Sequence, residues 1–348
     1  MEGTTPARNP EREAFYQEIS PSNLAPLWEV LHGLVTPEPV TPVLPALWKW
    51  AEVRPLIERA GKIITAAEAE RRVLVLENPG LRGKSSITHS LFAGMQLILP
   101  GEVARAHRHA ASALRFILEG HGAYTAVDGE RTYMEPGDFV ITPSWTFHDH
   151  GNTTNTPMVW LDGLDVPLVN LLDTSFQERT ASETQEETRQ PGDSMARFGA
   201  GLMPVDWKPK TRTSPVFTYP WEHTRGALET MKREQEWDPV HGLKLKFINP
   251  ATGEHAMPTI GTFMQLLPKE FSTAPYRATD STVYVCVEGK GMTHVGDQFF
   301  TWGPRDIFVV PSWYRHFHHA DEESVLFSFS DRPVQEKLDL WREDRGNH

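Results

Sequence analysis

Two histidines separated by one residue, His107 and His109, are the clearest sign of chemistry in this sequence. Alternate residues of a β-strand point to the same face, so these two side chains can share one metal ion if the segment is a strand. Neutral imidazole is the commonest metal ligand among side chains. The chain has 15 histidines, and the other groups are His148 with His150, and His316 with His318 and His319. This spacing indicates a histidine-based metal site.

The segments around the first two groups resemble the two motifs of the cupin superfamily, whose members are double-stranded β-helix (jelly-roll) barrels. The first motif runs Gly101, five residues, His107, Arg108, His109. The second runs Gly137, five residues, Pro143, Ser144, Trp145, two residues, His148, three residues, Asn152, with Trp145 in place of a glycine. The joint match implies a barrel in which His107, His109 and His148 bind one metal.

The carboxylate that cupins usually add to these ligands is absent. Counting back from Gly120, the glutamate of the motif belongs at Ala113, and neither Ala113 nor Leu114 is a ligand. Arg115 lies two residues further along and shares the strand face of Ala113. A cation buried beside a metal is costly unless an anion is present. We therefore expect an anionic substrate to supply the missing negative charge.

The elements that must position these residues change character along the chain. Residues 10–78 contain good helix formers at helical spacing, and the proline-rich segment 37–45 separates two predicted helices. From about residue 86, short segments rich in β-branched and aromatic residues alternate with turn residues, a pattern typical of a sandwich or barrel. Residues 177–195 are polar and predict an exposed loop, and the C-terminal segment VQEKLDLWRE predicts a short helix.

An internal repeat indicates two copies of one β domain. Residues 114–130 resemble 283–298, and residues 138–150 resemble 306–318; both copies contain "PSW" with a histidine three residues after the tryptophan. The second copy has no histidine in TAPYRATDSTVYV, the segment that corresponds to the first motif, although His316 and His318 remain. We therefore expect the C-terminal barrel to be metal-free and structural.

These patterns predict a mainly β protein, a bicupin of two double-stranded β-helix barrels with a helical N-terminal extension. The expected divisions are a helical extension at 1–85, a metal-bearing barrel at 86–172, a polar linker at 173–215 and a degenerate barrel with a terminal helix at 216–348. A length of 348 residues agrees with two domains.

Composition narrows the functional class. The formal net charge of −12 argues against nucleic acid as a partner. No apolar run approaches the roughly 18 residues that span a membrane, and the N-terminus lacks an apolar signal core. Cys286 is the single cysteine, which excludes an intrachain disulfide and cysteine-rich zinc sites. We expect a cytoplasmic protein.

A bicupin with this N-terminal extension and the stretch from His107 to Asn152 resembles the gentisate 1,2-dioxygenase family, which includes salicylate and 1-hydroxy-2-naphthoate dioxygenases. The resemblance covers nearly the whole chain. It implies one Fe(II) per subunit, held by His107, His109 and His148, O2-dependent ring cleavage of a small aromatic 2-hydroxy acid, and a homotetramer. For gentisate the product would be maleylpyruvate.

The resemblance also supports roles for residues near the metal. We expect Arg115 to hold the substrate carboxylate or an oxygen intermediate, His150 to move a proton at the substrate hydroxyl, and Asp162 to orient a histidine or a substrate group. The expected substrate-binding residues are Gln96, Arg115, Arg71, Phe92 and Gly94.

Three alternatives remain at this stage. One is a cupin isomerase or a manganese or zinc enzyme, although such enzymes usually keep the glutamate. Another is a non-enzymatic bicupin, such as a storage or sensor protein. The third concerns the substrate, because salicylate or 1-hydroxy-2-naphthoate can replace gentisate if the pocket around Phe92, Gly94 and Val73 allows it. Gentisate is favoured as the commoner substrate in the family.

Overall fold

The computed structural model describes residues 9–346, and these divide into two compact units. The first unit, up to Val40, contains the helices α1 (Pro10–Ile19) and α2 (Leu27–Leu34), with a 3-10 turn (Ser20–Ser22) after α1. Helix α1 begins where the Asn9 side chain accepts a hydrogen bond from the Glu11 amide, with a proline at the first helical position.

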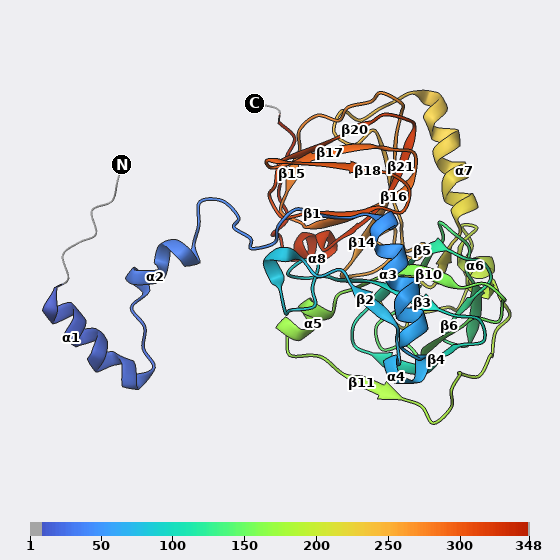
Figure 1. The fold of residues 1–348 in the computed structure, drawn as a ribbon, viewed down its shortest axis with the longest axis horizontal. Helices are drawn as coiled ribbons and strands as arrows, with labels where there is room; N and C mark the ends of the chain where they lie inside the picture. Colours follow the sequence, from blue (N-terminus) through green and yellow to red (C-terminus); the bar gives the residue numbers. More distant parts are fainter. Residues whose placement is uncertain (1–8, 347–348) are drawn as a thin grey trace. The chain divides into compact units, whose positions relative to one another are not determined.

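The second unit, from Thr41 onward, consists of two antiparallel β barrels that lie next to each other (Figure 1). In the N-terminal barrel, drawn mainly in cyan and green, a six-stranded sheet faces a five-stranded sheet. In order across the first sheet, the strands are β12 (Thr218–Tyr219), β8 (Phe139–Thr142), β5 (Ala113–Glu119), β10 (Met158–Leu164), β3 (Phe92–Ile98) and β2 (Val73–Val75). The second sheet contains β11 (Gln177–Arg179), β4 (Val103–His109), β9 (His148–Gly151), β6 (Tyr124–Val127) and β7 (Glu130–Tyr133).

The C-terminal barrel repeats this plan. Its six-stranded sheet contains β1 (Ala46–Trp48), β19 (Ile307–Val310), β16 (Thr282–Glu288), β21 (Ser324–Ser330), β14 (Gly261–Leu267) and β13 (Leu243–Lys246). The opposite side contains β18 (Gln298–Trp302), β17 (Gly291–Val295) and β20 (His316–Ala320), with the short pair β15 (Arg277–Ala278) and β22 (Glu343–Asp344) beside them. The prediction of a mainly β bicupin is confirmed.

The helices of this unit are short, apart from two that cover the barrels. They are α3 (Trp50–Ile63), α4 (Ala66–Ala69), α5 (Val166–Leu171), α6 (Asp193–Phe198), α7 (Trp221–Met231) and α8 (Arg332–Lys337), with 3-10 turns at Pro79–Leu81 and Lys232–Glu234. Helix α3 packs on β3 through the fully buried Ile57. No helix within residues 9–346 is long and apolar enough to cross a membrane.

One hydrophobic cluster joins the two barrels. It combines apolar residues from both six-stranded sheets, and the rings of Phe116 and Phe327 stack within it at 4.2 Å. Separate clusters fill each barrel: Ile117 and Trp160 belong to the N-terminal one, and Phe308 to the C-terminal one. Apolar residues therefore occupy both faces of the large sheets.

The structure departs from the predicted elements in several places. Within the helical prediction for residues 10–78, Ala46–Trp48 and Val73–Val75 are strands, β1 and β2. Each adds to the edge of a large sheet, a non-local pairing that local helix propensity cannot reveal. The predicted helix in VQEKLDLWRE ends at Lys337, and the chain continues to β22. The polar segment 177–195 contains β11, which pairs with β4.

Two equivalent turns relate the barrels at atomic detail. Trp145 and Trp313 both adopt positive φ (58° and 64°), a conformation that favours the glycine usual at this position of the motif. The Trp145 amide donates to the His109 carbonyl at 2.8 Å, and the Trp313 amide donates to the Ala278 carbonyl at 2.7 Å. His109 and Ala278 therefore occupy equivalent positions.

Candidate metal and substrate site

Three histidine side chains meet inside the N-terminal barrel. His107 and His109 project from β4, and His148 from the adjacent β9, where it is directly paired with His107. The ring centroids lie 5.2 Å apart for His107 and His109, 4.3 Å for His107 and His148, and 4.9 Å for His109 and His148. One nitrogen from each ring lies within 4.8 Å of the other two, which makes the group a candidate metal site.

Backbone carbonyls set the tautomer of two of these rings, those of His109 and His148. Nδ1 of His109 lies 2.7 Å from the Ala111 carbonyl oxygen, and Nδ1 of His148 lies 2.9 Å from that of Thr146. A carbonyl only accepts, so both Nδ1 atoms carry the proton and both Nε2 atoms keep a free lone pair. Nδ1 of His107 differs, because it lies 3.2 Å from the Arg105 carbonyl but only 2.7 Å from Nη2 of Arg71, which can only donate. The donor set thus fits a metal ion bound through Nε2 of His109 and His148, and through Nε2 of His107 once its Nδ1 donates to the Arg105 carbonyl instead.

The surroundings keep the three imidazoles neutral, as metal binding requires. Burial, followed by the charge of Arg71, lowers the pKa of His107 to about 3. Burial also lowers the pKa of His109, and it holds the pKa of His148, with Arg115 next in effect, well below its usual value.

Arg115 is a buried cation beside this group. It lies on β5, is 4% exposed, and donates to the Thr142 hydroxyl at 2.6 Å and to Nε2 of His150 at 3.0 Å. Its Nε has no hydrogen-bond partner among the described residues, and the Asp162 carboxylate is 3.6 Å away. Ala113, two residues earlier, pairs with Thr142, so no carboxylate stands where the cupin motif has its glutamate. The end of the barrel therefore carries an incompletely bonded positive charge.

His150 supports Arg115 from the adjacent sheet. Arginine only donates, so Nε2 of His150 accepts from it, and Nδ1 carries the proton toward the Thr125 hydroxyl at 2.9 Å. Burial and the charge of Arg115 hold the pKa of His150 well below its usual value. In this arrangement His150 must release Arg115 before it can accept a proton.

Asp162 supplies a buried carboxylate directly beside Arg115. It pairs with Arg115 across β10 and β5, is 5% exposed, and accepts from the Trp160 indole at 2.9 Å. Burial raises the pKa of Asp162 to about 6, although Arg115 and the Trp160 hydrogen bond oppose the shift. Arg71 also acts on this carboxylate, so Asp162 interacts with two arginines.

Arg71 reaches the site from the segment before β2. Its Nη2 donates to the Arg105 carbonyl at 2.8 Å and lies 2.7 Å from Nδ1 of His107. Burial, followed by the charge of Arg115, lowers the pKa of Arg71 to about 10. When His107 Nδ1 donates to the Arg105 carbonyl, it cannot accept from Arg71, so Arg71 gains free donor capacity for an anion.

Gln96, Phe92 and Gly94 share one face of β3. Gly94 pairs with Asp162, and the 4% exposed Gln96 pairs with Trp160. A Cβ at Gly94 would lie 2.4 Å from the Val73 side chain and 3.1 Å from the Phe92 ring. A larger residue at position 94 would therefore displace the Val73 or Phe92 side chain.

Sequence reasoning did not identify Thr125, Thr142 and Trp160 as members of the site. Thr125 and Thr142 orient His150 and Arg115, and Trp160 bonds Asp162. The only available signal was alternation, which places Thr142 on one face of β8 with Val140, a residue of the barrel interior.

Comparison with known proteins identifies the family. A model described as a cupin domain matches residues 94–165, which include all three histidines. A gentisate 1,2-dioxygenase of Aquipseudomonas alcaligenes is 57% identical over 98% of this chain and 98% of its own length. The chain belongs to the gentisate 1,2-dioxygenase family of cupin ring-cleaving dioxygenases. The resemblance inferred from the motifs is confirmed.

Other members of this family are more distant. A 1-hydroxy-2-naphthoate 1,2-dioxygenase of Nocardioides is 32% identical over 95% of this chain and 87% of its own length. The solved structure of salicylate 1,2-dioxygenase from Pseudoaminobacter salicylatoxidans, with gentisate adducts, has a TM-score of 0.93 and 33% identity. It covers 100% of this chain and 97% of the other. The family thus includes enzymes named for three different aromatic acids.

Proposed function

We propose that this protein is an Fe(II)-dependent gentisate 1,2-dioxygenase that converts gentisate and O2 to maleylpyruvate, with both oxygen atoms entering the product. The observation that carries the proposal is the group of three neutral histidines beside the incompletely bonded Arg115. The 57% identity to a gentisate 1,2-dioxygenase favours gentisate over salicylate and 1-hydroxy-2-naphthoate, whose enzymes are 32–33% identical.

In this proposal His107, His109 and His148 hold the iron through Nε2. Bound there, Fe(II) would supply the redox chemistry that zinc lacks. The backbone carbonyls of Ala111 and Thr146 hold the His109 and His148 rings in the required tautomer.

The remaining residues bind and orient the substrate. Arg115, whose Nε has no hydrogen bond, and Arg71 neutralise the substrate carboxylate, and Asp162 balances their charge. His150 positions Arg115 and accepts a proton at Nε2 from the substrate hydroxyl when the arginine turns to the substrate. Gln96 provides an amide for the ring substituents.

Phe92 and Gly94 form the wall that limits ring size. Because a Cβ at Gly94 would approach Val73 and Phe92 closely, we expect a larger residue at position 94 to disturb substrate binding. We further infer a cytoplasmic homotetramer with one iron per subunit, from the resemblance of the chain to this family; light scattering and iron analysis test the assembly and the stoichiometry.

The test is anaerobic reconstitution with Fe(II), followed by O2 uptake on gentisate, salicylate and 1-hydroxy-2-naphthoate in parallel. We expect the highest kcat/KM with gentisate and no uptake with zinc-loaded protein. Slower turnover of gentisate than of the other acids would overturn the substrate assignment. O2 uptake with none of them would overturn the dioxygenase assignment.

A further inference from the structure

The C-terminal barrel has a cavity at the position that the metal site occupies in the N-terminal barrel. His316 follows the Trp313 turn as His148 follows the Trp145 turn. His316 forms a bridge with Tyr276, as His148 pairs with His107. Tyr276 and Ala278 therefore take the places of the His107 and His109 ligands.

The strand pairings extend this equivalence to the rest of the site. Tyr284 pairs with Ser328 as Arg115 pairs with Asp162. Lys244, on β13, pairs with Gln265, as Val73 on β2 pairs with Gln96. The cavity between these strands has a volume of about 320 Å³, within the range of small-molecule sites, and its lining includes Lys244, Phe263, Tyr276, Tyr284 and His316.

Lys244 gives this cavity an unpaired cation. Among residues 9–346 its ammonium has no hydrogen bond or ion pair, and it lies 5.0 Å from the Phe263 ring and 5.8 Å from the Tyr284 ring. Burial lowers the pKa of Lys244 to about 8, and Asp280 opposes the shift. A charge removed from water without a partner is unfavourable unless an anion joins it.

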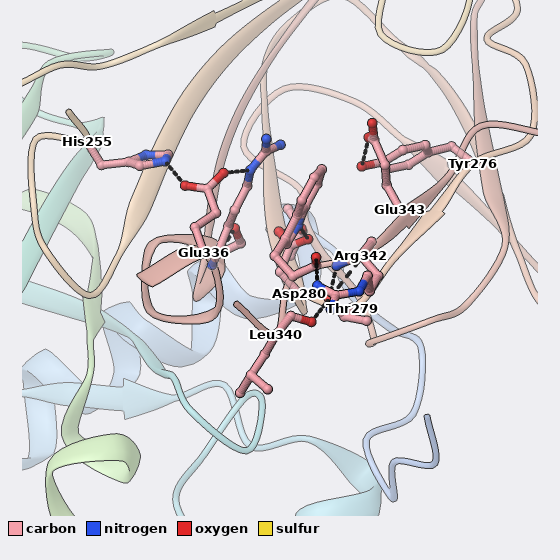
Figure 2. A network of polar contacts seen from close by, with 12 residues as sticks. His255, Tyr276, Thr279, Asp280, Glu336, Leu340, Arg342 and Glu343 are labelled. Atoms are coloured by element: carbon pink, nitrogen blue, oxygen red, sulfur yellow. Dashed lines mark hydrogen bonds and ion pairs between the residues drawn. The ribbon is translucent and has the colours of Figure 1, made fainter. Parts of the chain in front are cut away.

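The carboxylates that line the cavity already have partners of their own. Glu336 accepts from Arg332 at 2.6 Å and lies 3.1 Å from Nε2 of His255, and Figure 2 shows His255 pointing toward it. Asp280 accepts from the Trp341 indole at 2.9 Å. Neither carboxylate lies within ion-pair distance of Lys244. The acidic groups that line the cavity are therefore bonded to other residues and leave the Lys244 ammonium without an ion pair.

We propose that this cavity binds a small aromatic carboxylate, whose anionic group pairs with the Lys244 ammonium and whose ring packs against Tyr276, Tyr284 and Phe263. The aromatic lining favours a flat, apolar ligand body, and Lys244 supplies the positive charge that a metal supplies in the other barrel. Nε2 of His316 has no partner among the described residues and is available to a substituent on the ring. This inference does not depend on the proposed ring-cleavage reaction.

The test uses the full-length, iron-loaded protein and radiolabelled benzoate in anaerobic equilibrium dialysis. Benzoate lacks the adjacent hydroxyl that would let it chelate a metal. Binding is compared among the unaltered protein, Arg115→Met, Lys244→Met and Lys269→Met, the last a control at an exposed lysine of the same barrel. Lys244→Gln repeats the test with a polar side chain if the methionine variant folds poorly, and inorganic phosphate is the competing probe.

We expect one benzoate per chain in Arg115→Met, at least ten-fold weaker binding at this site in Lys244→Met, and no change in Lys269→Met. Ring cleavage should be unaffected by Lys244→Met, and its Tm should equal or exceed that of the unaltered protein. Benzoate binding that disappears in Arg115→Met and persists in Lys244→Met would overturn the proposal. Displacement of benzoate by phosphate at equal concentration would also overturn it, because the site would then select charge rather than an aromatic carboxylate.

Discussion

The two barrels of this chain have the same connectivity and different contents at the same end. The N-terminal barrel places His107, His109 and Arg115 there, whereas the C-terminal barrel has Tyr276, Ala278 and Tyr284 at the equivalent positions. The hydrogen bonds and ring contacts around these positions, which we call the supporting contacts, are more alike in the two barrels than the residues at the positions themselves. Fold and chemistry are therefore separable in this molecule, since a few strand positions decide whether a barrel can hold a metal.

Two supporting contacts occur in both barrels. The Thr125 hydroxyl lies 2.9 Å from Nδ1 of His150, and the Thr293 hydroxyl lies 2.8 Å from Nδ1 of His318. Outside the barrels, Arg108 lies 4.6 Å from the Trp145 ring, and Arg277 lies 4.5 Å from the Trp313 ring. Because these contacts also occur in the barrel that has no histidine triad, they serve the fold. The effect of removing one on catalysis is therefore compared with the effect of removing its counterpart in the C-terminal barrel.

The largest difference between the barrels should come from the ligand positions. His107→Ala removes one of three convergent nitrogens, and we expect iron content to fall to near zero and kcat/KM to fall at least ~100-fold, more than for the loss of a supporting contact. Tyr276→Ala, at the equivalent position, should change neither value. Metal analysis of the purified proteins and O2 uptake check both variants. Full iron content in His107→Ala would contradict the assignment of the ligands.

Arg115 should give the next largest effect. In Arg115→Met the iron ligands remain, but the buried charge expected to hold the substrate carboxylate is lost, so we expect normal iron content and a fall in kcat/KM of about 10²–10³-fold. Tyr284→Phe is the matched change in the other barrel and should leave kcat/KM unaltered. Separate values of kcat and KM from O2 uptake show whether binding or turnover is affected. An unchanged kcat/KM in Arg115→Met would remove this residue from the site.

Much of this comparison was predictable from the sequence, and the exceptions have a common physical cause. His107, His109 and Arg115 are identified by period-two alternation on neighbouring strands, and the repeated "PSW" turns reveal the second barrel. Thr125 could not be recognised, because hydroxyl residues are common in strands and only the register of β6 and β9 brings it to His150. The segment Ala46–Trp48 was also misassigned, since its partner β19 lies more than 250 residues further along the chain.

Only the N-terminal barrel should show a pH dependence from this position, because Asp162 titrates and its counterpart in the C-terminal barrel, Ser328, does not. Burial raises the folded-state pKa of Asp162 from 3.8 to about 6, so the folded protein favours the protonated carboxyl. This contribution to stability is complete below pH 3.8 and is lost as the pH rises through about 6. Catalysis has the opposite requirement, because only the ionised carboxylate balances Arg115 and Arg71.

Accordingly, kcat/KM of the unaltered protein should fall below pH 6, and Asp162→Asn should lose this acid limb with a fall of about 10-fold at pH 7.5. Urea unfolding at several pH values should show a smaller change in unfolding free energy between pH 4 and 6 for Asp162→Asn. Ser328→Ala is the control in the second barrel. An acid limb that persists in Asp162→Asn would assign the titration to another group.

The threonine–histidine pairs should give the smallest difference, and they separate structural from catalytic effects most clearly. Thr125→Val leaves the buried Nδ1 proton of His150 without its acceptor, which typically costs about 1–3 kcal/mol of unfolding free energy. Thr293→Val should cost at least as much, because Thr293 also accepts from the Trp302 indole at 2.9 Å. Only Thr125→Val disturbs a histidine that holds Arg115, so only this variant should lower kcat/KM, by several-fold. Thr125→Ser, which keeps the hydroxyl, should restore most of the rate. Equal losses of activity in both valine variants would mean that the assay reports stability, and His150 would then serve the barrel in the same way that His318 does.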